Sequence, residues 1–103
     1  MSQVSAYLRD CDGGYLHWCP GCAAMHMIPV SEPLPNEARW SFDGDLTTPT
    51  FHPSVNISWE EPTPGRCHYF LHAGQLKFCS DSTHALSGQT VPLPMLSVAD
   101  RTE

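Results

Sequence analysis

Residues 67–79 read CHYFLHAGQLKFC, and this stretch carries the clearest structural signal in the chain. Two runs that mix aromatic or aliphatic residues with polar ones, 67–72 and 75–79, flank the dipeptide Ala73-Gly74. Two strand-like runs separated by two turn residues are typical of a β-hairpin. We therefore predict an antiparallel hairpin here.

Further strands are expected on both sides of this hairpin. Residues 13–19 (GGYLHWC) and 23–30 read as a strand and a return strand around a tight loop. Residues 50–59 (TFHPSVNISW) also read as a strand, in which Pro53 predicts an edge position or a bulge, because proline cannot donate to a strand ladder.

The remaining segments predict little helix. Residues 31–37 form a proline-rich connector, and residues 89–96 are expected to be extended. A single helical turn is expected within 80–88, ended by Gly88. With ten prolines and seven glycines in 103 residues, the chain favours turns over long helices. We expect one mainly β domain over residues 1–103, a small zinc-binding domain of antiparallel hairpins with its core at about 13–96.

Charge and hydropathy exclude several classes of function. Eleven Asp and Glu oppose five Lys and Arg, and the basic residues are scattered singly, so a nucleic-acid groove is disfavoured. No stretch approaches the roughly 18 apolar residues that a membrane helix needs. The N-terminal residues lack the features of a signal peptide, so we expect a cytoplasmic protein without a membrane partner.

The motif Cys19-Pro20-Gly21-Cys22 predicts half of a metal site. A C-x-x-C loop brings two thiolates to one ion, and thiolate and imidazole are the usual ligands of Zn²⁺. The same motif can also be a redox pair, but no βαβ pattern surrounds it. In a reducing compartment, cysteines are metal ligands or free thiols more often than disulfides. Cys67 is the expected third sulfur ligand.

A histidine is expected to complete the zinc site. His26 lies four residues after Cys22 on the predicted return strand, and it is the preferred fourth ligand. His68 and His84 remain alternatives, although His68 follows Cys67 directly and points to the opposite face of a regular strand. Cys79 is expected to be an ordinary small strand residue.

The order of these motifs resembles a family of small bacteriophage and prophage proteins, some of which carry the label ammonia monooxygenase. The resemblance covers residues 13–94 and rests on WCPGC with a following histidine at 18–26, PTFHPS at 49–54, CH at 67–68 and DSTH at 81–84. It implies that Cys19, Cys22, His26, Cys67, His68 and His84 matter, and it implies the cytoplasm of an infected bacterium. The chain departs from the family pattern at Ser82, where cysteine is usual.

Three functions are compatible with these features. The first is a non-enzymatic interaction module that modulates a host or defence protein, with zinc in a structural role. Its expected partner is a host or phage protein. The alternative is a zinc-dependent hydrolase that uses His68, Asp81 and His84 near the metal, with Asp81 orienting His84. The third is nucleic-acid binding through a zinc-ribbon-like knuckle, which the acidic charge disfavours.

Overall fold

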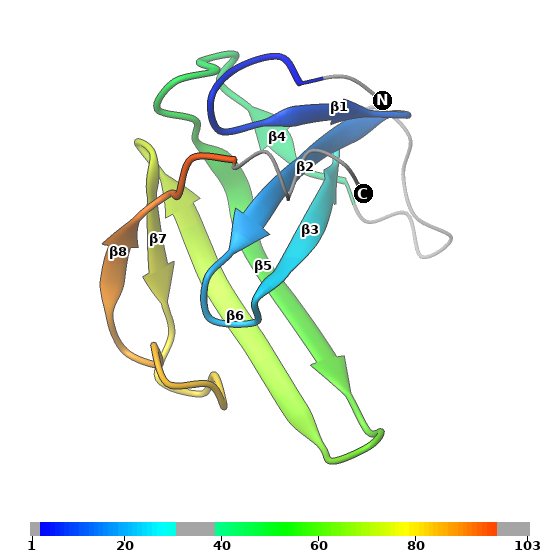
Figure 1. Cartoon of the computed structure of the whole chain (residues 1–103), viewed down its shortest axis with the longest axis vertical. Helices are drawn as coiled ribbons and strands as arrows, with labels where there is room; N and C mark the ends of the chain where they lie inside the picture. Colours follow the sequence, from blue (N-terminus) through cyan, green and yellow to red (C-terminus); the bar gives the residue numbers. More distant parts are fainter. Residues whose placement is uncertain (1–2, 31–38, 97–103) are drawn as a thin grey trace.

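The chain folds into two antiparallel β-sheets in a computed structural model that describes residues 3–30 and 39–96 (Figure 1). The first sheet has three strands in the order β1-β2-β3: β1 (Arg9–Cys11), β2 (Gly14–Cys19) and β3 (Ala24–Pro29). The CPGC loop joins β2 to β3, as the sequence predicts. The mainly β fold is confirmed.

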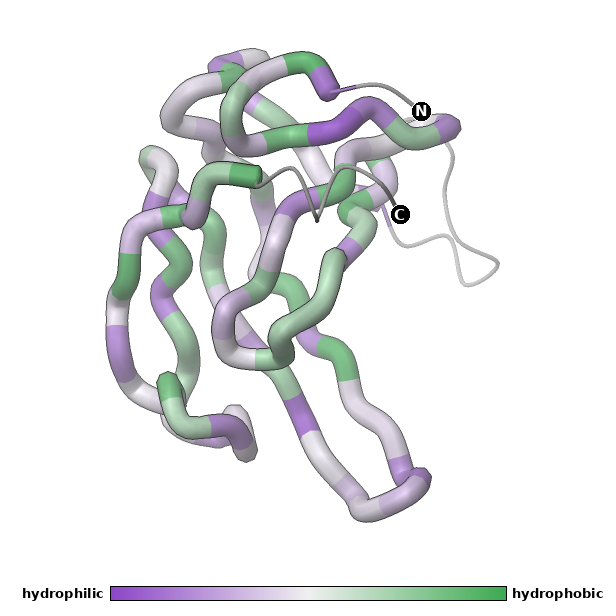
Figure 2. Tube along the Cα trace, viewed as in Figure 1, coloured by the Kyte–Doolittle hydropathy of each residue, from purple (hydrophilic) through white to green (hydrophobic). Residues whose placement is uncertain are grey.

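The second sheet has five strands in chain order. They are β4 (Ser41–Phe42), β5 (Phe51–Trp59), β6 (Gly65–His72), β7 (Gln75–Phe78) and β8 (Thr90–Pro92). The predicted hairpin at 67–79 is the pair β6–β7, and its two turn residues, Ala73 and Gly74, have φ of 49° and 76°. Both angles are left-handed, which the tight hairpin turn requires. Figure 2 shows neutral and hydrophilic residues at the far end of the neighbouring β5–β6 hairpin.

The core lies where the two sheets face each other. Residues of β6 alternate between the faces of its sheet: Cys67, Tyr69 and Leu71 are buried, whereas Phe70 and His72 are exposed. The buried cluster also takes residues from the strands of both sheets and from the segment just before β1. These include Leu8, Cys19, Ile28, Phe51, Val55, Leu76 and Phe78. Alternation therefore gives β6 an inner, apolar face and an outer face that solvent reaches.

Strand β5 carries the bulge that Pro53 predicts. Phe51 pairs with Leu71 and Val55 pairs with Tyr69, so residues 52–54 lie opposite Phe70 alone. A bulge re-aims the side chains around it. The indole N–H of Trp40 donates to the carbonyl oxygen of Ser54 at 3.2 Å and holds the irregular segment.

The segment after β7 differs from the expected helical turn. Within residues 3–30 and 39–96 there is no helix, and therefore none that could cross a membrane. Residues 84–89 form two turns instead, in which the N–H of Ser87 donates to the carbonyl of His84 and the N–H of Gln89 to that of Leu86. The expected connector at 31–37 lies outside the described residues.

Candidate functional site

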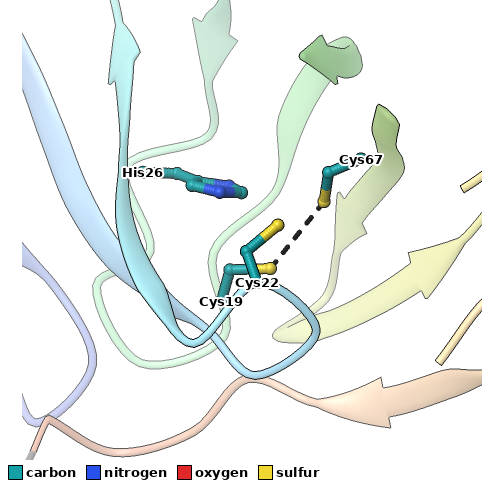
Figure 3. A group of neighbouring side chains, drawn as sticks. All are labelled: Cys19, Cys22, His26 and Cys67. Atoms are coloured by element: carbon teal, nitrogen blue, oxygen red, sulfur yellow. Dashed lines mark hydrogen bonds between the residues drawn. The ribbon is translucent and has the colours of Figure 1, made fainter. Parts of the chain in front are cut away.

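Four predicted ligands meet between the two sheets. Cys19 ends β2, Cys22 lies in the β2–β3 loop, His26 is in β3 and Cys67 in β6, and their side chains point toward one another (Figure 3). One donor atom of each lies within 4.8 Å of the others. The sulfurs of Cys19 and Cys67 are 3.8 Å apart. Two sulfurs at about 2.3 Å from one tetrahedral zinc have nearly this separation. We call these four residues the metal cluster, since they can bind a metal ion.

The acidities of the three thiols favour a cation in the metal cluster. The hydrogen bond from Cys67 lowers the pKa of Cys19 to about 6, against the effect of burial. The same hydrogen bond, burial and the charge of Cys19 raise the pKa of Cys67. Within the metal cluster, Cys19 therefore ionises more readily than Cys67. Three thiolates at these distances require a metal ion to neutralise them.

A chain of hydrogen bonds orients His26 for a metal ion. Nδ1 of His17 lies 3.2 Å from the carbonyl oxygen of Trp18, which only accepts, so this nitrogen carries the proton. Nε2 of His17 then accepts from the Tyr69 hydroxyl at 2.6 Å. The Tyr69 oxygen accepts from Nδ1 of His26 at 3.1 Å. This arrangement leaves the lone pair of His26 Nε2 free for coordination.

The chain of hydrogen bonds through His17, Tyr69 and His26 requires both imidazoles to be neutral. Burial, followed by the charge of His26, lowers the pKa of His17 to about 3. Burial also lowers the pKa of His26 to about 4, helped by His84. Both rings are therefore neutral at pH 7. His17 is fully buried and belongs to this chain of hydrogen bonds.

His84 lies at the rim of the metal cluster. Its Nε2 is 3.4 Å from the Cys67 sulfur, and its Nδ1 accepts the backbone N–H of Leu86 at 3.2 Å. A neutral ring with Nδ1 unprotonated carries its proton on Nε2, so His84 donates to Cys67. The ring rests on Gly21, where a Cβ atom would come within 2.6 Å of three ring atoms. Beside it a hollow of about 500 Å³ reaches Cys22 and His26.

A second group of polar side chains occupies the outer face of β5 and β6. The Ser54 hydroxyl lies 3.1 Å from Nε2 of His68, and Nδ1 of His68 lies 3.1 Å from Oδ1 of Asp81. Because the Asp81 carboxylate only accepts, Nδ1 carries the proton and Nε2 accepts from Ser54. Arg66 contacts the other Asp81 oxygen at 3.4 Å. A nucleophile, a base and an orienting carboxylate are therefore aligned.

Local structure explains how the three residues meet. The bulge in β5 turns Ser54 toward β6. The His68 side chain points to the face of β6 opposite to that of Cys67, because successive side chains of a strand alternate. Ser82, 7% exposed, accepts the backbone N–H of His68 and donates to its carbonyl, both at 3.0 Å, and so fixes the neighbouring Asp81. Partial desolvation opposes ionisation of Asp81, but the hydrogen bond and charge of His68 lower its pKa.

Two hollows flank this group on the outer face. One of about 280 Å³ is lined by Phe51, His52, Phe70, Leu71, His72 and Lys77. It adjoins His68, whose ring is stacked on that of Phe70 with centroids 6.4 Å apart. The other, of about 290 Å³, reaches Asp81 and Arg66. The first hollow therefore lies beside the His68 ring, and the second lies beside the Asp81 carboxylate.

The structure separates residues that the sequence hypothesis grouped. His84 contacts the metal cluster, whereas His68 and Asp81 contact each other on the opposite face of β6. The expectation that Asp81 orients His84 is wrong, because the partner of Asp81 is His68. Cys79 lies close to His68 and Asp81. Sequence reasoning missed Ser54; the break that Pro53 makes in the strand is the signal that marked its position.

The fold and its sites define a class of all-β protein in which a cysteine-rich metal-binding cluster backs a Ser-His-Asp arrangement. Residues 1–79 match the model of the family BubE, described as a bacterial ubiquitination-like system serine protease, and the chain belongs to this family. No curated protein and no solved structure matches the chain. The matched region contains Ser54, His68 and the whole metal cluster. The family description names a bacterial system. The phage origin stays a prediction.

Proposed function

We propose that this protein is a serine protease of a bacterial ubiquitination-like system, with Ser54 as nucleophile, His68 as general base and Asp81 as the carboxylate that orients His68. The observation that carries the proposal is the continuous pair of hydrogen bonds from Ser54 through His68 to Asp81. The family description supplies the reaction class independently of this geometry.

The proposed reaction follows from the three side chains. Ser54 Oγ attacks the scissile carbonyl carbon while Nε2 of His68 takes the hydroxyl proton, and Asp81 stabilises the imidazolium through Nδ1–H. The bond to the leaving group breaks as His68 returns the proton to it, which leaves an acyl-Ser54 ester. Water then attacks this ester with His68 again as base, releasing a carboxylic acid and free Ser54.

The proposed substrate is a ubiquitin-like protein joined through its C-terminus to another molecule. A ubiquitination-like system makes such bonds, and a protease in it removes them. This partner replaces the unspecified host or defence protein of the interaction hypothesis. The interaction module without catalysis remains the competing function, and it differs in requiring no reactive serine.

We propose zinc for the metal cluster, with Cys19, Cys22, Cys67 and His26 as ligands. Three thiolates and one imidazole form a donor set of structural zinc sites, which hold four protein ligands and no reactive water. Zinc would fix the β2–β3 loop to β6. It takes no part in the proposed chemistry, because the Ser54 hydroxyl lies on the other face of the sheet.

Labelling with a fluorophosphonate probe, followed by mass spectrometry of the intact chain and its peptides, tests the proposed nucleophile. We expect one adduct per chain at Ser54, lost in Ser54→Ala and slowed strongly in His68→Ala. Ser58→Ala is a matched control, since Ser58 is an exposed serine of the same strand. A folded protein that acquires no adduct, and that cleaves no fluorescent amide or ester at the C-terminus of a bacterial ubiquitin-like protein, would favour the interaction module.

A further inference from the structure

One short segment, residues 79–84, touches both sites. Asp81 bonds to His68 on the outer face of β6, and three residues later His84 reaches the sulfur of Cys67 on the inner face. The segment begins where β7 ends, since Phe78 is the last residue of that strand and pairs with Tyr69. It therefore takes the place of a strand beside the first half of β6.

Hydroxyl side chains replace strand pairing along this segment. The N–H of Cys79 donates to the carbonyl of His68 at 2.8 Å, and Ser82 then bonds to both backbone groups of His68. The N–H of Thr83 donates to the Arg66 carbonyl at 2.9 Å, and the Thr83 hydroxyl accepts the N–H of Arg66 at 3.0 Å. The segment thus stays aligned with β6 residue by residue.

The outer part of this attachment is open to water. Asp81, Thr83 and Arg66 are exposed, so their hydrogen bonds compete with solvent. His84 gives the segment a firmer anchor, because its ring contacts Gly21 and lies edge-on to Phe78 with centroids 4.6 Å apart. A hydrogen bond from its Nε2 to a metal-bound thiolate is charge-assisted and stronger than one to a neutral group.

We propose that the metal cluster holds Asp81 in register with His68 through residues 79–84, with Ser82 and His84 as positioning residues. The inference rests on the proposed function for its catalytic meaning, but the link itself is independent of any reaction. Metal bound to Cys67 fixes His84, His84 fixes the end of the segment, and Ser82 transmits that position to Asp81. Loss of metal then disorders the carboxylate while Ser54 and His68 remain on paired strands.

Two variants interrupt the link without removing a residue of the metal cluster or of the Ser-His-Asp group. His84→Ala deletes the anchor. Gly21→Ala places a Cβ atom within 2.6 Å of the His84 ring and displaces it. For the zinc-loaded protein we expect both variants to retain one metal per chain and to lower kcat for p-nitrophenyl acetate by about 10- to 100-fold, the usual effect of a residue behind the reacting groups. Ala85→Ser, at an exposed neighbouring position, serves as the control.

A double-mutant cycle with Asp81→Asn separates positioning from general damage. If His84 acts through Asp81, His84→Ala has little further effect on kcat in the Asp81→Asn background. The proton NMR signal of His68 Nδ1–H, hydrogen-bonded to Asp81, should also weaken in His84→Ala and on metal removal. Ser82→Thr keeps the hydroxyl and should keep this signal, whereas Ser82→Ala should lose it.

Any of three results would overturn the inference. One is a double variant in which the fold losses in kcat from His84→Ala and from Asp81→Asn multiply fully. The second is a His68 Nδ1–H signal unchanged in metal-free protein that remains folded. The third is departure of the metal in His84→Ala, because His84 would then support metal binding itself and not only the position of the segment. If the wild-type protein hydrolyses nothing, the proposed function fails. The link between the metal cluster and Asp81 can still be tested, because the His68 Nδ1–H signal needs no activity and can be measured even in Ser54→Ala protein.

Discussion

Cys67 and His68 are consecutive residues of β6, yet they belong to different sites on opposite faces of one sheet. The Cys67 sulfur lies 3.8 Å from that of Cys19 in the buried metal cluster, whereas the His68 ring lies 3.1 Å from the Ser54 hydroxyl. Alternation along the strand produces this separation, because successive side chains point to opposite faces. The metal cluster and the Ser-His-Asp group therefore lie back to back on the two faces of β6.

Substituting Asp81 by asparagine should reduce activity far more than it reduces stability. The amide presents no negative charge to His68 and permits the wrong tautomer, an effect worth about 10⁴ in kcat where such a triad operates. We expect kcat for an ester substrate to fall by 10²- to 10⁴-fold on this basis, with KM nearly unchanged. Steady-state kinetics measure the effect.

The control for that experiment is Asp12→Asn, which removes another exposed carboxylate, in the turn between β1 and β2 of the other sheet. It should leave kcat within a factor of about two, since ordinary surface substitutions have small effects. Equal losses in the two variants would contradict the assigned role of Asp81.

Tyr69→Phe should weaken metal binding while leaving the ligands in place. The hydroxyl joins Nε2 of His17 to Nδ1 of His26, so its loss leaves the orientation and tautomer of His26 unfixed. Removing such a partner lowers metal affinity by about 10- to 100-fold. Competition with a chromogenic chelator measures the affinity, with Tyr15→Phe as the matched control. Identical affinities in the two variants would show that the hydrogen-bond chain has no part in binding.

Cys67→Ser should lose the metal and much of the stability, whereas Cys79→Ser should keep both. Cys67 is buried in the metal cluster and is its only ligand from the second sheet among residues 3–30 and 39–96. Metal binding and folding are coupled, so chelation of the wild-type protein should lower its melting temperature to near that of Cys67→Ser. The hollow beside Cys22 and His26 gives a chelator access. Metal analysis and thermal melts test both variants.

Acid should destabilise the protein partly through Asp45. The backbone N–H of Thr48, then that of Thr47 and the Thr48 hydroxyl, lower the pKa of this carboxyl in the folded state. A folded pKa below the unfolded one adds stability at neutral pH, and that stability is lost as the pH falls through the folded pKa. Asp45→Asn should therefore be less stable than wild type at pH 7, with the difference shrinking toward pH 2. Urea unfolding at several pH values measures this difference.

Glu60→Gln is the control for the pH series, because Glu60 is exposed and makes no hydrogen bond within the described residues. Its difference in unfolding free energy from wild type should be small at every pH. A wild-type advantage over Asp45→Asn that grows on acidification would have the wrong sign for a lowered pKa.

Local chemistry determined much of this protein from sequence alone. Ala73-Gly74 specify the β6–β7 turn, Pro53 specifies an interruption of β5, and the CPGC spacing brings Cys19 and Cys22 together, because each signal acts within a few neighbouring residues. The sequence also predicted Cys67 and a set of candidate histidines beside Cys19 and Cys22, and the structure places Cys67 and His26 close to these two cysteines. The local signals could not choose among those histidines.

Only the tertiary structure decided which distant residues meet. Ser54, His68 and Asp81 lie 14 and 13 residues apart, and such a group has no fixed order or spacing in sequence, since it is defined by geometry. The bulge in β5 and the hydroxyl groups that fasten Ser82 to β6 bring them together. His17 and Tyr69, 52 residues apart, likewise become partners only when the two sheets pack. Local preference fixes strands and turns, whereas the packing of one sheet on the other assembles the metal cluster, and contacts within the second sheet bring Ser54, His68 and Asp81 together.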